Sequence, residues 1–132
     1  MINKILETQI LNMASGKEID AMIAEKIFGW KFIKPTHGTC CTCQTCGYNY
    51  DDCICGYSIN LEKSWEVIEA FMYGKYPSKY ATNCEITLHI AEDKYDDLYS
   101  CKIESPTLLV EAKADTFELA VCRCALLAIF SE

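Results

Sequence analysis

The segment from residue 36 to residue 57 holds six of the ten cysteines in the chain. Two thiolates that stand two residues apart can face one metal ion, because a tight turn brings them together, and a second pair then completes a tetrahedron. The simplest set of four in this segment is Cys43, Cys46, Cys53 and Cys55. The spacing predicts a structural zinc site that staples the loop. The two remaining thiols leave other ligand sets open, and a reduced loop or an oxidised cluster is the alternative to a metal site.

Histidine is scarce in this chain, which limits the reactions that it could catalyse. Only His37, in the cysteine-rich segment, and His89 are present. Neither stands in a recognisable nucleophile–base arrangement, and the sequence has no glycine-rich phosphate loop. The cysteine-rich segment also lacks a nearby glutamate that would serve a catalytic zinc as general base. We therefore expect a protein that is not an enzyme.

Arg123 is the single arginine of the chain, and it stands among apolar residues near the C-terminus. A guanidinium that is removed from water must be paired with groups that accept its hydrogen bonds. One interpretation is an ion pair with a carboxylate of an earlier helix, such as Glu25 or Glu66. The other is a clamp for a phosphate or carboxylate in a pocket at a subunit interface, because a guanidinium matches two oxygens of such a group at once.

Aromatic residues between positions 57 and 65 could stack on a planar ligand. Tyr57 comes just before an expected helix start around Ser58 and Asn60, where free backbone N–H groups would favour an anion. Trp65 lies on the apolar stripe of that helix, a position that is more often in the core but that can also face a ligand. We predict a ligand-binding site made of Tyr57, Ser58, Asn60, Trp65 and Arg123.

Helices at both ends of the chain enclose a set of strands in the expected fold. Apolar periodicity predicts helices at about 2–13, 15–29, 60–72 and 115–130, and strict alternation predicts strands at 84–90, 99–104 and 108–114. Ser15 and Glu18 have the spacing of a capping box, which would begin the second helix.

The last predicted helix is apolar around almost its whole circumference, and only Glu118 and Arg123 interrupt it. A helix that is apolar on every side is buried on every side, so it is either central or covered by a second subunit. The cysteines outside the loop also occupy apolar positions, which predicts small buried side chains. They are Cys84, Cys101, Cys122 and Cys124.

Together these elements predict one α+β domain over residues 1–132, in which the cysteine-rich loop at 36–57 is an insertion. We expect a three-layer α/β/α-type sandwich with a three- to four-stranded antiparallel sheet, N-terminal helices and a buried C-terminal helix. Such helices can cover one face of the sheet or both.

The charge of the chain argues against nucleic acid as a partner. Its formal net charge is −7, and its lysines are scattered among acidic residues. Binding to a nucleic acid polymer needs clustered basic residues that release counterions from the phosphates. No apolar run approaches the roughly 20 residues that a membrane span needs, and the N-terminus lacks the pattern of a signal peptide. We expect a protein of a reducing cytoplasm, where clustered cysteines more often bind metal than form disulfides.

Three segments of the chain resemble the phage ABA-sandwich domain family, in the order in which the family has them. They are AMIAEKIFGW at 21–30, GYSINLEKSWEVIEAF at 56–71 and EAKADTFELAVCRCALLAIF at 111–130. The resemblance implies an α–β–α sandwich in a bacteriophage protein that works inside a bacterial host. The cysteine-rich loop departs from the family pattern, and it resembles an insertion that is particular to the branch of the family to which this chain is similar.

Small oligomeric phage proteins of similar size include the anti-Thoeris and anti-CBASS sponges, which sequester nucleotide immune signals. By this analogy we expect a homo-oligomer in the host cytoplasm that binds a small nucleotide-derived ligand, such as an ADP-ribose-type molecule or a cyclic nucleotide, without cleaving it. The alternative is a zinc-stapled adaptor that inhibits a host protein by contact. A hydrolase that acts on such signals is a third hypothesis.

Overall fold

The computed structural model describes residues 3–28, 32–33, 42–43, 56–73, 85–90, 99–106 and 108–131. The elements are, in order, α1 (Lys4–Leu11), α2 (Lys17–Lys26), β1 (Phe32–Ile33), β2 (Thr42–Cys43), α4 (Leu61–Tyr73), β3 (Glu85–Ile90), β4 (Tyr99–Ser105), β5 (Leu108–Ala114) and α5 (Phe117–Phe130). The short strands β1 and β2 pair with each other, and β3, β4 and β5 form a separate antiparallel sheet in that order.

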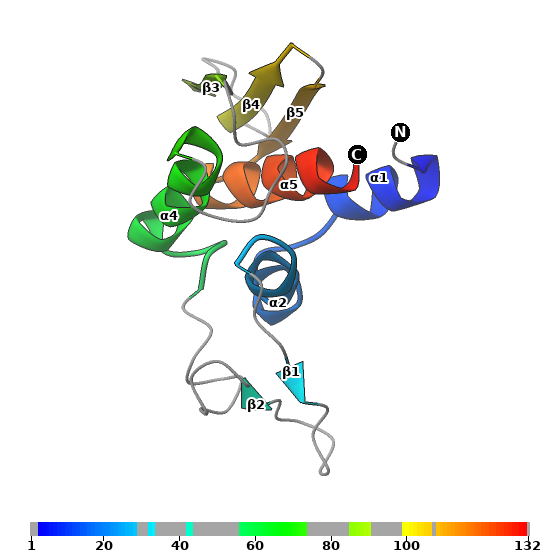
Figure 1. Cartoon of the computed structure of the whole chain (residues 1–132), viewed down its shortest axis with the longest axis vertical. Coiled ribbons are helices and arrows are strands. Elements are labelled where there is room, and N and C mark those ends of the chain that lie inside the picture. The colour runs from blue at the N-terminus through cyan, green and yellow to red at the C-terminus, as the bar shows by residue number, and fades with distance from the viewer. Residues whose placement is uncertain are drawn as a thin grey trace.

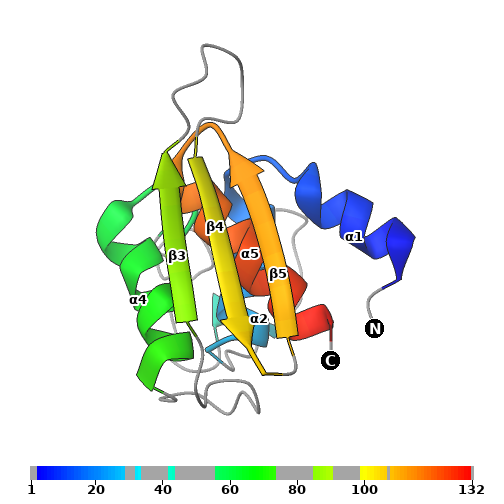
Figure 2. The same cartoon turned by 90° about the horizontal axis from the view of Figure 1, so that it is seen from above.

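The sheet has one buried face and one polar face, as the alternation in the sequence predicts. Cys101 and Ile103 of β4 lie opposite Ala112 and Val110 of β5, and these side chains point toward the helices. Between them come residues such as Lys102, whose neighbours across the sheet are polar or charged. The described helices lie on the apolar face of the sheet (Figure 2).

Helix α5 is the centre of the fold, which confirms the prediction of a buried C-terminal helix. Nine of its 14 residues are buried. It contacts β4 and β5 on one side and α1, α2 and α4 on the others. Figure 1 shows α5 beneath the sheet, with α4 and α1 flanking it and α2 below. The small side chains of α5, such as Ala120, Cys124 and Ala128, let these neighbours approach closely.

These layers confirm the α+β class, the antiparallel sheet and the sandwich architecture. The start of α5 also agrees with its sequence, since the Thr116 hydroxyl accepts a hydrogen bond from the Leu119 N–H at 3.2 Å. The predicted cap of α2 is wrong. The N-cap residue is Gly16, with φ +144° and no side-chain cap, and its N–H donates to the Ser58 hydroxyl at 2.9 Å. Ser58, 42 positions later, thus accepts from the N–H of the N-cap residue, a role that the predicted capping box gives to Glu18.

Candidate binding groove

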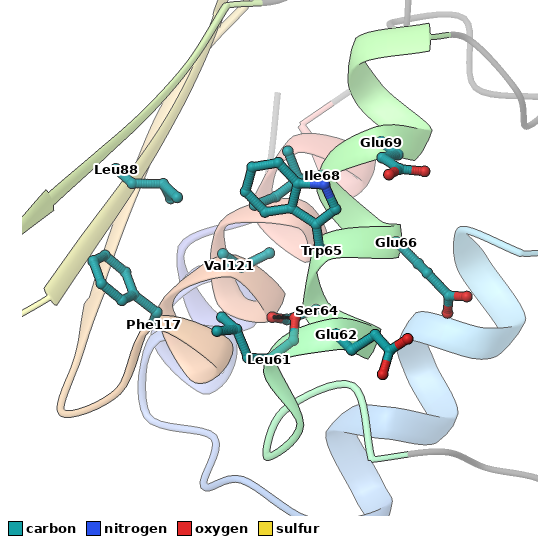
Figure 3. A pocket seen from close by; sticks show the side chains of 10 residues that line it. All are labelled: Leu61, Glu62, Ser64, Trp65, Glu66, Ile68, Glu69, Leu88, Phe117 and Val121. Carbon is teal, nitrogen blue, oxygen red and sulfur yellow. Dashed lines mark hydrogen bonds between the residues drawn. The ribbon is translucent and has the colours of Figure 1, made fainter.

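An open groove of about 730 Å³ lies between α4, β3 and the beginning of α5. Apolar side chains from three elements face one another across it (Figure 3). The residues that line it are Leu61, Glu62, Ser64, Trp65, Glu66, Ile68, Glu69, Leu88, Phe117 and Val121. Its volume is within the range of small-ligand sites, roughly 300–1,000 Å³.

The groove exists because the apolar stripe of α4 continues past the part of the helix that the core covers. Ile68 is only 4% exposed, whereas Trp65 is 49% exposed and Leu61 is 60% exposed. Opposite them, Leu88 points from the edge strand β3 toward the indole of Trp65 (Figure 3). Large apolar side chains that gather on a surface usually mark a place of interaction.

Acidic side chains border the groove but do not enter it. The carboxylates of Glu62, Glu66 and Glu69 point to the side of α4 away from Leu88 (Figure 3). Among the described residues no lysine or arginine lines the groove. The Ser64 hydroxyl donates to the Leu61 carbonyl at 2.8 Å, so its proton is already engaged and cannot be donated to an anion. An apolar group with positive charge nearby matches this surface better than an anion does.

The turn that precedes α4 has few free N–H groups left for an anion. The Ser58 N–H donates to Asp20 Oδ1 at 2.8 Å, and the N–H groups of Ile59 and Asn60 both donate to the Gly56 carbonyl. The Asn60 side chain accepts from the Lys63 N–H at 3.2 Å and so caps α4. The sequence-based expectation of open N–H donors at this turn is therefore wrong for these positions.

Tyr57 and Ser58 are core residues in this structure. Tyr57 is 4% exposed, and its ring stacks on Phe28 with the ring centroids 5.0 Å apart. Ser58 is 1% exposed and joins the N-terminus of α2 to the turn before α4, through its bonds with Gly16 and Asp20. Burial raises the pKa of Asp20, and the hydrogen bonds from Ser58 act in the opposite direction.

The guanidinium of Arg123 binds backbone carbonyls rather than the carboxylates that the sequence suggested. Its Nε and Nη2 donate to the Met13 carbonyl at 3.0 and 2.7 Å, and Nη1 donates to the Lys113 carbonyl at 2.7 Å. The two glutamates proposed as partners instead lie beside lysines, at 3.6 Å in each case. These pairs are Glu25 with Lys26 and Glu66 with Lys63.

The structure does not bring the five predicted ligand-binding residues together. Trp65 lines the groove, and none of the other four does. The described hydrogen bonds join Arg123 to Met13 and Lys113, and not to the turn at 57–60. Sequence reasoning missed the partners of Trp65 in the groove, above all Leu88 and Phe117. The signal for Leu88 was its place on the apolar side of an alternating strand.

Most of the predicted zinc ligands lie outside the described residues. Cys43 belongs to β2, which pairs with β1, while Cys46, Cys53 and Cys55 are beyond the described ranges. Within those ranges, no three side chains of His, Cys, Asp or Glu lie close enough to hold a metal ion together.

Three of the four cysteines predicted to be buried lie among the described residues, and all three are buried free thiols. They are Cys101, Cys122 and Cys124. The Cys124 thiol donates to the Val110 carbonyl at 3.6 Å. The pKa of Cys124 is raised mainly by a hydrogen bond with Cys101 and, second, by burial. The pKa of Cys122 is raised mainly by burial. Cys84 lies outside the described residues.

The fold and the groove define a small α+β sandwich whose edge offers an open apolar surface. The chain belongs to the phage ABA sandwich domain family, whose sequence profile matches residues 21–126. It is also similar to the 2.0 Å crystal structure of a phage protein from Bacillus cereus ATCC 14579. That similarity has 22% sequence identity and a TM-score of 0.61, and covers 89% of this chain and 90% of the other. At this identity it shows a shared fold.

A comparison with curated proteins gave no match. None of the helices in the described part of the chain has the length and apolar character that a bilayer span requires.

Proposed function

We propose that this phage protein is a non-enzymatic binding protein that acts by contact with a protein of the bacterial host, in the host cytoplasm. The observation that carries the proposal is the exposed indole of Trp65, which faces Leu88 across an open apolar groove. Tryptophan is among the residues that most often dominate the binding energy of an interface. The glutamates on the rim of α4 and the net charge of −7 favour a partner that carries positive charge around an apolar anchor.

Sequestration of a nucleotide-derived signal is the second candidate. The exposed indole and the groove volume favour it, because a base can stack on an aromatic ring in a pocket of this size. The phosphates of such a ligand also need cations or N–H donors. Since the described groove residues supply no cation and Arg123 binds carbonyls elsewhere, a second copy in a homo-oligomer would have to provide them.

We further propose that Cys43, Cys46, Cys53 and Cys55 hold a structural zinc ion as four thiolates. The support is the spacing of these residues in the sequence. Zinc has a structural role in this proposal, and the groove binds its partner without it.

The test is capture of host proteins from a lysate by the full chain and two variants. Trp65→Ala removes the centre of the groove. Leu109→Ala removes another exposed apolar side chain, 63% accessible, from the polar face of the sheet. We expect a host protein that the wild type and Leu109→Ala retain and Trp65→Ala does not. A set of retained proteins that is the same for all three overturns the contact proposal. If heating releases a nucleotide from the wild-type protein but not from Trp65→Ala, the second candidate is established instead.

A further inference from the structure

The hydrogen bond from Arg123 to Lys113 reveals how the backbone of the sheet is oriented. The Lys113 carbonyl accepts from Arg123 at 2.7 Å, and the same guanidinium binds the Met13 carbonyl just past the end of α1. Helix α1 lies on the side of β5 away from β4 (Figure 2), so the Lys113 carbonyl is taken to point to that side. In an antiparallel pair, opposite residues alternate between those that exchange both backbone hydrogen bonds and those that exchange none. Lys113 lies opposite Ser100. This pair therefore exchanges none, and the backbone groups of Ser100 point toward β3.

The same alternation identifies the free backbone groups of β3. Ser100 lies opposite His89, so these two residues exchange both of their hydrogen bonds. The residues between the bonded positions, Ile86, Leu88 and Ile90, then turn their N–H and C=O groups away from β4. Within the described part of the chain, β3 has no strand on that side. Such an edge is a template for one more strand.

The groove lies along this free edge. Figure 2 shows α4 beside β3, on the side opposite β4, and Figure 3 shows the side chains of Trp65 and Leu61 on the face of α4 that looks toward β3. In a strand added to β3, the residue opposite Leu88 would point its side chain to the same face as Leu88. Every second side chain of that strand would therefore point to the face of the sheet that carries the groove, and one of them would reach Trp65.

A second copy of the chain does not fit the same place. Two copies that paired antiparallel through β3 would be related by a two-fold axis perpendicular to the sheet at its edge. Because α4 lies beside that edge, the rotation would carry the second α4 into the space that the first α4 occupies (Figure 2). This geometry excludes a second subunit at the edge but does not exclude a single extended segment.

We infer that the groove binds an extended polypeptide segment, which adds to β3 as a fourth strand and places apolar side chains against Trp65. The inference rests on the proposed contact with a host protein and names the form that the bound part takes. Carboxylates stand on the polar face of the sheet at this edge, where Glu85 of β3 lies opposite Glu104 of β4, while the glutamates of α4 point away from β3 (Figure 3). The segment therefore alternates apolar residues with lysine or arginine.

The probe is the fluorescent peptide acetyl-KVKVKVK-amide, measured by anisotropy against the full chain. In the inferred complex its valines lie opposite Ile86, Leu88 and Ile90 and form the hydrogen bonds to β3. Methylation of the backbone amide nitrogens of the valines removes those donors but keeps the side chains. Methylation of the backbone amide nitrogens of the lysines is the matched control. We expect the parent peptide to bind, the valine-methylated peptide to bind at least about tenfold more weakly, and the lysine-methylated peptide to stay within about threefold.

Three results overturn the inference. In the first, the parent peptide does not bind at about 1 mM. In the second, the two methylated peptides bind equally well. In the third, the glutamate analogue acetyl-EVEVEVE-amide binds as well as the parent peptide. Two variants of the chain test the inference independently. Ile90 does not line the groove. Ile90→Pro removes its backbone N–H from the edge of β3, while Ile90→Ala keeps that N–H. Ile90→Pro should bind at least about threefold more weakly than Ile90→Ala. If a host protein is still captured through Trp65 while the peptide results fail, the contact proposal stands and the added strand is wrong.

Discussion

The guanidinium of Arg123 holds the carbonyl oxygen of Met13, a residue 110 positions earlier in the chain, with two hydrogen bonds. A third bond from the same group reaches the carbonyl of Lys113 at the free edge of β5. One side chain therefore joins α5, the connection between α1 and α2, and the edge of the sheet. The arrangement also covers part of the β5 edge, which leaves β3 as the more accessible edge of the sheet.

Replacement of Arg123 should reduce stability and leave the groove intact. Arg123→Ala removes the donors for two carbonyls and should cost about 1–3 kcal/mol in the free energy of unfolding, because a backbone carbonyl that loses its partner is poorly compensated. Arg123→Lys should recover part of this loss. Urea unfolding followed by circular dichroism measures both. The control is Lys113→Ala, which removes a charge but keeps the carbonyl that Arg123 binds.

A different outcome for Arg123 would revive the sequence-based hypothesis of a ligand clamp. If Arg123→Ala unfolds at the same urea concentration as the wild type but no longer binds the captured partner, the guanidinium serves a ligand and not the fold.

Asp20 should make stability depend on pH. Burial raises its pKa above the value of 3.8 that is usual for this side chain, so the folded protein binds its proton more tightly than the unfolded chain does. The contribution of Asp20 to stability is therefore fully present below pH 3.8 and is lost as the pH rises through the folded-state pKa. In Asp20→Asn this contribution should vanish, while the amide oxygen can still accept from the Ser58 N–H. Urea unfolding of both proteins between pH 3 and pH 7 measures the difference.

The expected sign is specific. The stability of the wild type relative to Asp20→Asn should increase as the pH falls across this window. A difference that is constant with pH, or that decreases as the pH falls, would contradict the buried, protonation-favouring environment of Asp20.

The three buried thiols should resist modification in the folded protein. Cys101, Cys122 and Cys124 are shielded from solvent, and the raised pKa values of Cys122 and Cys124 keep the reactive thiolate scarce at neutral pH. Peptide mapping after treatment with iodoacetamide should show them reacting at least about a hundredfold more slowly in buffer than in denaturant, because reaction requires opening of the core. Labelling at equal rates in the two conditions would mean that α5 is not the stable centre of the fold.

Zinc should be present at one ion per chain. Native mass spectrometry of protein purified without chelator measures it directly, and the paired replacement of Cys43 and Cys46 by serine should abolish it. Because the zinc site is proposed as a staple, the metal-free chain should keep its affinity at the groove. A zinc-free wild-type protein would remove the staple, and loss of groove binding on chelation would give the metal a wider role.

Local patterns predicted much of the fold. The alternation of Leu108–Ala114 predicted the observed bounds of β5. The uniform apolar character of Phe117–Phe130 predicted a helix that is buried on every side, either centrally or by a second subunit. Both properties depend on neighbours in the sequence. The N–H of Gly16 at the start of α2 is bound by Ser58, which reaches it only after the chain has folded, and no local pattern contains that information.

The site was harder to predict for the same reason. The stripe of α4 indicated which side chains face inward, but whether the sheet reaches far enough to cover Trp65 is a property of tertiary packing. The sequence indicated that Arg123 must have hydrogen-bond acceptors. It could not indicate which ones, because every residue carries a carbonyl acceptor. The identity of Met13 and Lys113 as acceptors follows from where two connections lie in space.

The most direct test of the account is the dissociation constant of the captured host protein for the wild type, Trp65→Ala and Leu109→Ala, measured by calorimetry. If the groove is the binding site, Trp65→Ala should weaken binding by at least about thirtyfold, which corresponds to the roughly 2 kcal/mol of an interface hot spot. Leu109→Ala should remain within about twofold of the wild type, since exposed positions away from an interface contribute little. Equal dissociation constants for all three proteins, at unchanged melting temperature, would show that the partner binds elsewhere and that the groove is not the functional site.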